Sequence, residues 1–296
     1  MKRKTFISVI LALLLIFSLV ACSSPKEKDT SGDSNVEKPL DNQEEDASQE
    51  EDAILDGDDL LAFKDKELER LIRDVLEIDT DDILVEDLKD LEILEFKGDD
   101  YDVKDLDGLQ YAENLRNFRS DNLTIKSLDP LAKLENLSEV RLLDSQVEDS
   151  PTKFSTPSLS SVEISNTNIS DFSFLEGSTL KYLTLRENNI TSIDFVKDME
   201  NLEAIDMQDN LVSDLSPLEG KANIDYINFE NNQLLDIGAL ATVTGLEAAN
   251  LSDNPDLVDI DALVDLPNLE ILNIFGFKGD VTILEKLEDD GLRLSY

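Results

Sequence analysis

Carboxylates are the reactive side chains that this chain has in abundance. Its 296 residues include 67 Asp and Glu against 26 Lys and Arg, no His and one Cys. A pair of carboxylates can hydrolyse a glycosidic bond, and a cluster of them can bind a divalent cation. Because acids are so numerous here, no single pair stands out as catalytic. The absence of His excludes Ser-His-Asp triads, Cys-His pairs and His-ligated zinc.

One acidic segment, KGDDYDVKDLDG at residues 97–108, invites comparison with a calcium loop. Its spacing does not fit the EF-hand pattern D-x-[DN]-x-[DN]-G-x₅-E. We therefore interpret it as an acidic surface loop between core residues. The sequence favours a protein that is not an enzyme and needs no metal or cofactor, and a cation-dependent enzyme is the weakest alternative.

The charge balance bears on the class of partner. The formal net charge is −41, which repels nucleic acid and anionic membrane surfaces. General solvation of the surface is the ordinary explanation for such a charge. A basic partner or divalent cations are the sharper alternatives.

The N-terminus has the pattern of a secretory signal. Basic residues at 2–4 precede an apolar run at 6–20, which is shorter than the roughly 20 residues that span a bilayer. The following LVAC, residues 19–22, resembles the lipobox of bacterial lipoproteins. That resemblance implies removal of residues 1–21 and diacylation of Cys22, with the mature chain held on the membrane by its lipid. An ordinary cleaved signal or an uncleaved anchor is the alternative.

Residues 22–53 have the composition of a tether. They are rich in Ser, Asp, Glu and Lys and contain almost no apolar side chains, so they cannot bury enough surface to offset the entropy of ordering. We expect a disordered acidic tether with a span of roughly 30 Å or more. It would hold the folded part away from the membrane.

The rest of the chain repeats a spacing. Apolar residues recur every 21 to 24 positions within a template L-x-x-L-x-L-x-x-N-x-L, and a fixed period in this range indicates a solenoid. The units start at Leu91, Leu115, Leu137, Leu159, Leu180, Leu202, Ile224, Leu246 and Leu269. Alternating apolar residues would point inward from short parallel strands. One unit cannot cover its own apolar face, so only the stack is stable.

A column of Asn follows the strands. We expect these side chains to lie inside the stack and to bond backbone groups left unpaired by the turn. The column contains Asn188, Asn210, Asn232 and Asn254, with Thr167 at the equivalent earlier position. The column is broken by Asp99, Leu123, Ser145 and Phe277.

The repeats resemble a known family. NLVSDLSPLEG at 210–220 is similar to the internalin-type leucine-rich repeat of bacterial surface proteins. The resemblance implies an α/β leucine-rich-repeat solenoid at 91–296, with a parallel sheet on the concave face and short 3₁₀ or irregular turns on the convex side. It departs at the C-terminus, where no immunoglobulin-like module or wall-sorting motif follows the last unit, so host-receptor roles are not carried over.

Both ends of the solenoid need a cap. Residues 54–90 resemble the helical cap of bacterial surface repeat proteins, and apolar residues at helical spacing predict a helix of about 64–77. A shorter helix is expected around 85–89. We expect the final LEKLEDDGLRLSY to close the other end.

The outward strand positions on the concave side are where a partner would bind. Tyr and Arg are enriched at binding hot spots. The candidates on this side are Tyr182, Arg186, Tyr226, Phe275, Arg119 and Arg141. The alternative is that the arginines only neutralise neighbouring acids.

These observations predict a lipid-anchored binding protein on the extracytoplasmic face of a bacterial cell membrane, exposed at the cell surface. The expected partner is a protein or a cell-envelope glycan, not a nucleic acid, and the expected state is a monomer. An envelope scaffold or spacer without a ligand on the concave face is the alternative function.

Overall fold

A computed structural model describes residues 54–56, 59–79, 81–289 and 291–296. The chain divides into two compact units, 1–49 and 50–296, and the described residues belong to the second. The signal segment expected at 1–21, the lipidation site Cys22 and the tether expected at 22–53 lie outside the described residues.

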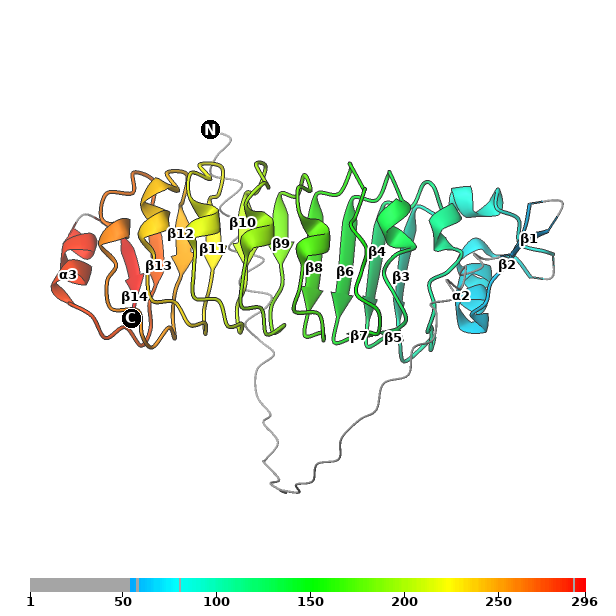
Figure 1. The fold of residues 1–296 in the computed structure, drawn as a ribbon, viewed down its shortest axis with the longest axis horizontal. Coiled ribbons are helices and arrows are strands. Elements are labelled where there is room, and N and C mark those ends of the chain that lie inside the picture. Colours follow the sequence, from blue (N-terminus) through cyan, green and yellow to red (C-terminus); the bar gives the residue numbers. More distant parts are fainter. Residues whose placement is uncertain (1–53, 57–58, 80, 290) are drawn as a thin grey trace, which may run out of the picture. The chain divides into compact units, whose positions relative to one another are not determined.

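The described repeats are joined by one parallel sheet, in which each strand pairs with the strand of the next repeat (Figure 1). The strands follow one another in chain order from one edge to the other, with no crossover. They are β3 (Ile93–Lys97), β4 (Asn117–Asp121), β6 (Glu139–Leu143), β8 (Ser161–Ser165), β9 (Tyr182–Thr184), β10 (Ala204–Asp206), β11 (Tyr226–Asn228), β12 (Ala248–Asn250), β13 (Ile271–Asn273) and β14 (Arg293–Ser295).

Residues on alternate sides of each strand have different surroundings. In β4, Phe118 and Ser120 are buried while Asn117, Arg119 and Asp121 stay partly exposed. The pairing register places buried residues of successive repeats side by side, as with Leu183, Ile205 and Ile227 (β9 to β11). The core is therefore a column of apolar layers, and the structure confirms the predicted leucine-rich-repeat solenoid.

The other side of most repeats is a single turn of 3₁₀ helix, as the 22-residue period predicts. In most of these turns a short polar side chain two residues before the turn accepts from the backbone amide of its first residue, as Asp214 Oδ1 does from the Ser216 amide at 2.8 Å. They are η2 (Leu109–Tyr111), η3 (Leu131–Lys133), η4 (Ser173–Leu175), η5 (Asp194–Val196), η6 (Ser216–Leu218), η7 (Gly238–Thr242) and η8 (Asp261–Leu263). A two-stranded sheet of β5 (Thr124–Ile125) and β7 (Gln146–Val147) links two of the earlier repeats.

The first repeat is preceded by a helix and a hairpin. Helix α2 (Lys66–Leu76) is capped at its start by Asp65, whose carboxylate accepts from the amides of Glu67 and Leu68. The helix buries Leu68, Leu71 and Ile72 against the core. The short helix expected around 85–89 is a 3₁₀ turn, η1 (Asp87–Asp90). The hairpin consists of β1 (Ile54–Asp56) and β2 (Leu60–Ala62). At the other end, α3 (Thr282–Asp289) buries Leu284 and Leu287 before β14.

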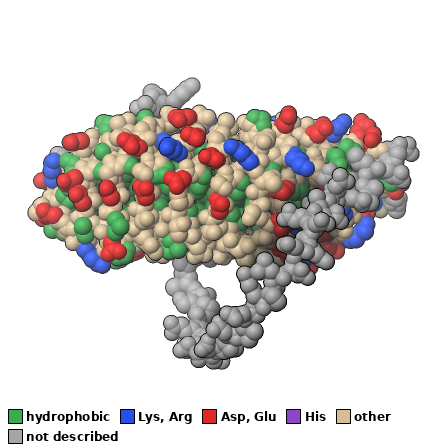
Figure 2. All heavy atoms as spheres, in the orientation of Figure 1, with side chains coloured by type: hydrophobic (Ala, Val, Ile, Leu, Met, Phe, Trp, Pro, Cys, Tyr) green, Lys and Arg blue, Asp and Glu red, His purple; other side chains and the backbone are tan. Residues whose placement is uncertain are grey.

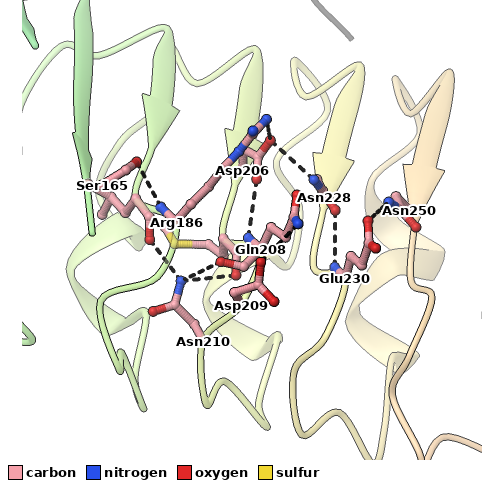
Figure 3. Close-up of polar contacts among 11 residues, drawn as sticks. Ser165, Arg186, Asp206, Gln208, Asp209, Asn210, Asn228, Glu230 and Asn250 are labelled. Carbon is pink, nitrogen blue, oxygen red and sulfur yellow. Dashed lines mark hydrogen bonds and ion pairs between the residues drawn. The ribbon is translucent and has the colours of Figure 1, made fainter. Parts of the chain in front are cut away.

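The Asn column lies inside the stack and binds backbone groups of neighbouring turns. Asn210 Oδ1 accepts from the amides of Asn188 and Ile190 at 3.1 and 2.9 Å. Its Nδ2, whose bonds are drawn in Figure 3, donates to the carbonyls of Leu185 and Met207 at 2.8 and 3.0 Å. Asn232 and Asn254 repeat this arrangement one and two units later. Each amide therefore joins two repeats through groups that no strand or helix satisfies.

Hydroxyl side chains take over this task in earlier repeats. Ser145 Oγ accepts from the Leu123 amide at 2.9 Å and donates to the Leu143 carbonyl at 2.6 Å. Thr167 Oγ1 donates to Asn188 Oδ1 at 2.8 Å. A hydroxyl has fewer hydrogen-bond donors than a side-chain amide. Ser145 therefore replaces only part of the hydrogen bonding that an Asn provides at this position.

The residue just before the Asn column adopts a left-handed backbone, which sequence inspection did not reveal. It is usually Asn or Asp, which tolerate this conformation. The positions are Asn122, Asp144, Asn166, Glu187, Asp209, Asn231 and Asp253, with φ between 50° and 57°. Neighbouring members bond one another, as Asn231 Nδ2 does to Asp209 Oδ1 at 2.6 Å. Glu187 is the exception in residue type.

Candidate binding surface on the open sheet face

The predicted concave side corresponds to the face of the main sheet that points away from the core. We call it the open sheet face, and it is formed by the outward residues of β3 to β14 and of the turns directly after them. The six candidate contact residues lie on it. Arg119 and Arg141 are paired in register on β4 and β6. Tyr182 and Tyr226 flank Ala204 in the same row. Arg186 and Phe275 follow β9 and β13.

The two arginines in the first half of the face are engaged by acids of adjacent strands. Arg119 donates from Nε and one terminal nitrogen to the two carboxylate oxygens of Glu139, both at 2.7 Å. Arg141 Nε donates to Glu163 at 2.9 Å. Hydrogen bonding to Arg119 holds the pKa of Glu139 below its usual range. These pairs fit the alternative that the arginines neutralise neighbouring acids, although both arginine side chains stay about one-third exposed.

The centre of the face holds a buried polar cluster, shown in Figure 3. Arg186 donates to Asp206 Oδ2 at 2.6 Å, and Asn228 Nδ2 donates to the same oxygen at 3.2 Å. One strand further along, Asn250 Nδ2 donates to Glu230 at 2.7 Å. The Asp206 side chain is only 7% exposed. The cluster thus contains an ion pair, Arg186 with Asp206, on the open sheet face. The carboxylate of that pair is too buried for a partner to contact much of it.

The prediction that Tyr226 projects from the sheet as a contact residue is wrong. Only 9% of Tyr226 is exposed. Its in-register neighbours are Ala204 and Ala248, and such short side chains leave room for the ring to settle on the sheet. The Tyr226 hydroxyl is buried and has no hydrogen-bond partner among the described residues. Burial raises the pKa of this phenol, and the charge of Asp206 adds to the effect.

Two aromatic side chains do offer surface. Phe275 is 65% exposed and Tyr182 36% exposed. The Tyr182 hydroxyl donates to Glu203 Oε2 at 2.9 Å, and burial followed by this bond raises the pKa of Tyr182 to about 12. The ring of Tyr182 is thereby fixed in place beside the polar cluster. Rings held in this way give contact area at low cost in entropy.

A row of acids, which sequence analysis did not single out, borders the open sheet face. Each member directly precedes a strand, from β10 to β13: Glu203, Asp225, Glu247 and Glu270. Lys181 pairs with Glu203 at 2.8 Å and Arg293 with Glu270 at 3.2 Å. Burial, with the charges of Glu247 and Glu203, raises the pKa of Asp225 to about 6. The repeat period, applied to the position before each strand, could have revealed this row.

Acidic side chains are not confined to this row. They are spread along the whole face drawn in Figure 2, with basic side chains scattered among them. Within the described residues, no three Asp, Glu or Cys side chains are grouped so as to hold a metal ion. No helix in the described part of the chain is long and apolar enough to cross a membrane.

Comparisons with known proteins agree with this architecture. The family described as "Leucine Rich repeats (2 copies)" matches residues 178–220. The internalin inlF of Listeria monocytogenes is 24% identical, with 78% of this chain and 75% of that chain covered and a TM-score of 0.60. The internalin inlC2 of the same species is 25% identical, with 75% and 89% covered and a TM-score of 0.53. InlP of Listeria monocytogenes is 19% identical, with 72% and 64% covered and a TM-score of 0.53.

A search of curated proteins finds no match. The similarity to known proteins therefore lies in the fold. The strand order and the 3₁₀ turns describe a leucine-rich-repeat solenoid, and the similar solved structures agree with it. The chain has the leucine-rich-repeat fold, and its structure is similar to those of the Listeria internalins.

Proposed function

We propose that this protein binds a polypeptide partner on its open sheet face and carries out no reaction there. The observation that carries the proposal is the exposure of Phe275 and Tyr182 on a rigid parallel sheet. Large aromatic side chains next to charged groups are the residue types that dominate protein interfaces. A stack of repeats presents these groups at fixed spacing, so a partner would meet a preformed surface.

The location of the protein is a second part of the proposal. Residues 1–22 have the pattern of a bacterial lipoprotein signal, so we infer that Cys22 carries lipid on the extracytoplasmic face of the cell membrane. Two acyl chains on one Cys give stable attachment. The binding surface would then be exposed at the cell surface, held off the membrane by residues 22–53.

The experiment begins with capture of a partner by the full-length chain. The captured molecule is then titrated calorimetrically against three single variants. Phe275→Ala and Tyr182→Ala should each weaken binding by about 2 kcal/mol, or roughly thirtyfold. The matched control is Lys197→Ala. Lys197 is exposed at the end of η5, away from the open sheet face, and its removal should change affinity by less than about twofold.

The opposite pattern would overturn the proposal. If Lys197→Ala weakens binding and the two aromatic variants do not, the partner binds on the side of the 3₁₀ turns. A captured glycan in place of a protein would retain the surface and change the class of partner. Capture of nothing under conditions that preserve the fold would favour the alternative of an envelope scaffold.

A further inference from the structure

The side of the solenoid that carries the 3₁₀ turns is hollowed where the last repeats meet the C-terminal helix. A groove of about 680 Å³ lies between the segment around η8 and helix α3, the red helix at one end of Figure 1. Its apolar lining consists of Val258, Ile260, Val264 and Ile283. Ile260 is buried, but Val258 is 56% exposed. The groove therefore has an apolar surface that the solenoid itself does not cover.

An independent observation comes from comparing Val258 with its equivalents in earlier repeats. The bond from a short polar side chain to the amide two residues later marks the same place in five repeats, at Asp171, Ser192, Asp214, Asp236 and Asp259. The residue before it is exposed in each case: Ser170, Thr191, Ser213, Leu235 and Val258. Three repeats thus have a hydroxyl there, and the last two have an aliphatic side chain. Leu235, 60% exposed, extends the apolar surface of the groove by one repeat, and adjacent exposed apolar side chains of this kind mark interaction sites.

Carboxylates surround this apolar surface. The groove is lined by four exposed acids, Asp259, Asp261, Asp265 and Asp280, whereas Lys286 is the only cation among its lining residues. Asp259 and Asp280 also accept from backbone amides of the segments that follow them, which fixes both carboxylates in place. A rim of this charge attracts basic groups and opposes a second copy of this chain, whose formal net charge is −41.

We propose that this groove, together with Leu235, is a second docking surface, which receives a segment of another protein that carries Lys or Arg beside aliphatic side chains. The aliphatic side chains would cover Val258 and Ile283 and so remove apolar surface from water. The basic groups would lie against the carboxylates of the rim, where complementary charge orients a partner and speeds its association. This surface is separate from the open sheet face, so a partner bound here would leave that face accessible.

The test must separate the groove from the negative charge of the whole molecule. The probes are three short fluorescent peptides. The first combines Lys and Leu, the second has Ser in place of Leu, and the third has Glu in place of Lys. Anisotropy titrations use the full-length chain in about 0.15 M salt, which screens distant charges.

Matched variants locate the binding. Val258→Ser introduces the hydroxyl of the earlier repeats, and its control is Leu211→Ser, which removes an exposed aliphatic side chain next to Asn210. The double variant Asp261→Asn/Asp265→Asn removes two charges from the rim. Its control, Glu176→Gln/Glu219→Gln, removes two charges at the ends of η4 and η6. All of these positions are exposed, so the fold should be retained.

The proposal predicts that the Lys/Leu peptide binds about fivefold or more tightly than the Lys/Ser peptide, and that the Glu/Leu peptide does not bind. Val258→Ser should lower the affinity for the Lys/Leu peptide about fivefold, and the rim variant should lower it about threefold or more. Both controls should stay within about twofold of the wild type.

Three results would overturn the proposal. Equal losses in a variant and its control would mean that the peptide responds to diffuse charge or to scattered apolar side chains. Equal affinity for the Lys/Leu and Lys/Ser peptides, or no binding of the first, would remove the role of the apolar surface. Sedimentation velocity tests the remaining occupant, because self-association that Val258→Ser abolishes would assign the groove to a second copy of this chain.

Discussion

Replacing Asn210 by Ala tests how far the solenoid depends on its internal amides. The substitution removes the acceptor for the buried amides of Asn188 and Ile190 and the donor to the Leu185 carbonyl. The Met207 carbonyl keeps the amide of Asn232 as a partner at 2.8 Å. Two orphaned amides at about 1–1.5 kcal/mol each predict a loss of about 2–3 kcal/mol in the free energy of unfolding.

Two further variants make this prediction specific. Gln208→Ala, two residues away on the open sheet face, removes one bond to Asp209 from a partly exposed side chain, so it should cost less than about 0.5 kcal/mol. Asn210→Ser should fall between the two, because Ser145, at the same place in an earlier repeat, shows that a hydroxyl can accept from an equivalent amide, that of Leu123. Urea denaturation followed by circular dichroism measures all three. Equal losses for the Asn210→Ala and Gln208→Ala variants would refute the role assigned to the amide.

Three other predictions concern single positions. Glu187→Asn should raise the free energy of unfolding by about 0.5–1 kcal/mol, because Asn tolerates the left-handed backbone at φ 56° better than Glu does; a urea midpoint at or below that of the wild type would count against this. A pKa of about 6 for Asp225 means that this carboxyl binds its proton more tightly in the folded chain than in the unfolded one, so its own contribution to stability falls as pH rises from about 4 to 6. After discounting for solvent screening, Asp225→Asn should stabilise the protein by about 1 kcal/mol at pH 7.5 and flatten that fall, and melts at pH 4 and 7.5 would show the reverse if the carboxylate were stabilising. Cys22→Ala should abolish lipid labelling and membrane retention, whereas a cleaved variant that stays membrane-bound on fractionation would contradict the anchor.

The sequence predicts the solenoid well because its core is periodic. Inward residues such as Ile205 and Ile227 must match their neighbours in register, so spacing alone reveals the strands. The same reasoning places Asn210 inside the stack. It also gives the N-terminal helix to within two residues at its start and one at its end, because apolar residues recur along it at helical spacing.

The binding surface is harder to predict, because outward positions carry no such constraint. Tyr182 and Tyr226 occupy equivalent positions two repeats apart, yet one is 36% exposed and the other 9%. The difference depends on how each ring turns among its neighbours, and the repeat pattern does not contain that information. Likewise, the raised pKa of Asp225 depends on its burial and on the charges of Glu247 and Glu203. Both residues lie in adjacent repeats, far from Asp225 in the chain.

The most direct test of the central claim locates the partner on the surface. A photo-crosslinking amino acid would be introduced at Phe275, and in a second variant at Lys197, in the full-length protein on living cells. The account predicts a cross-linked partner from the exposed position on the open sheet face and none from the position beside η5. Cross-linking from Lys197 but not from Phe275 would contradict recognition on the open sheet face.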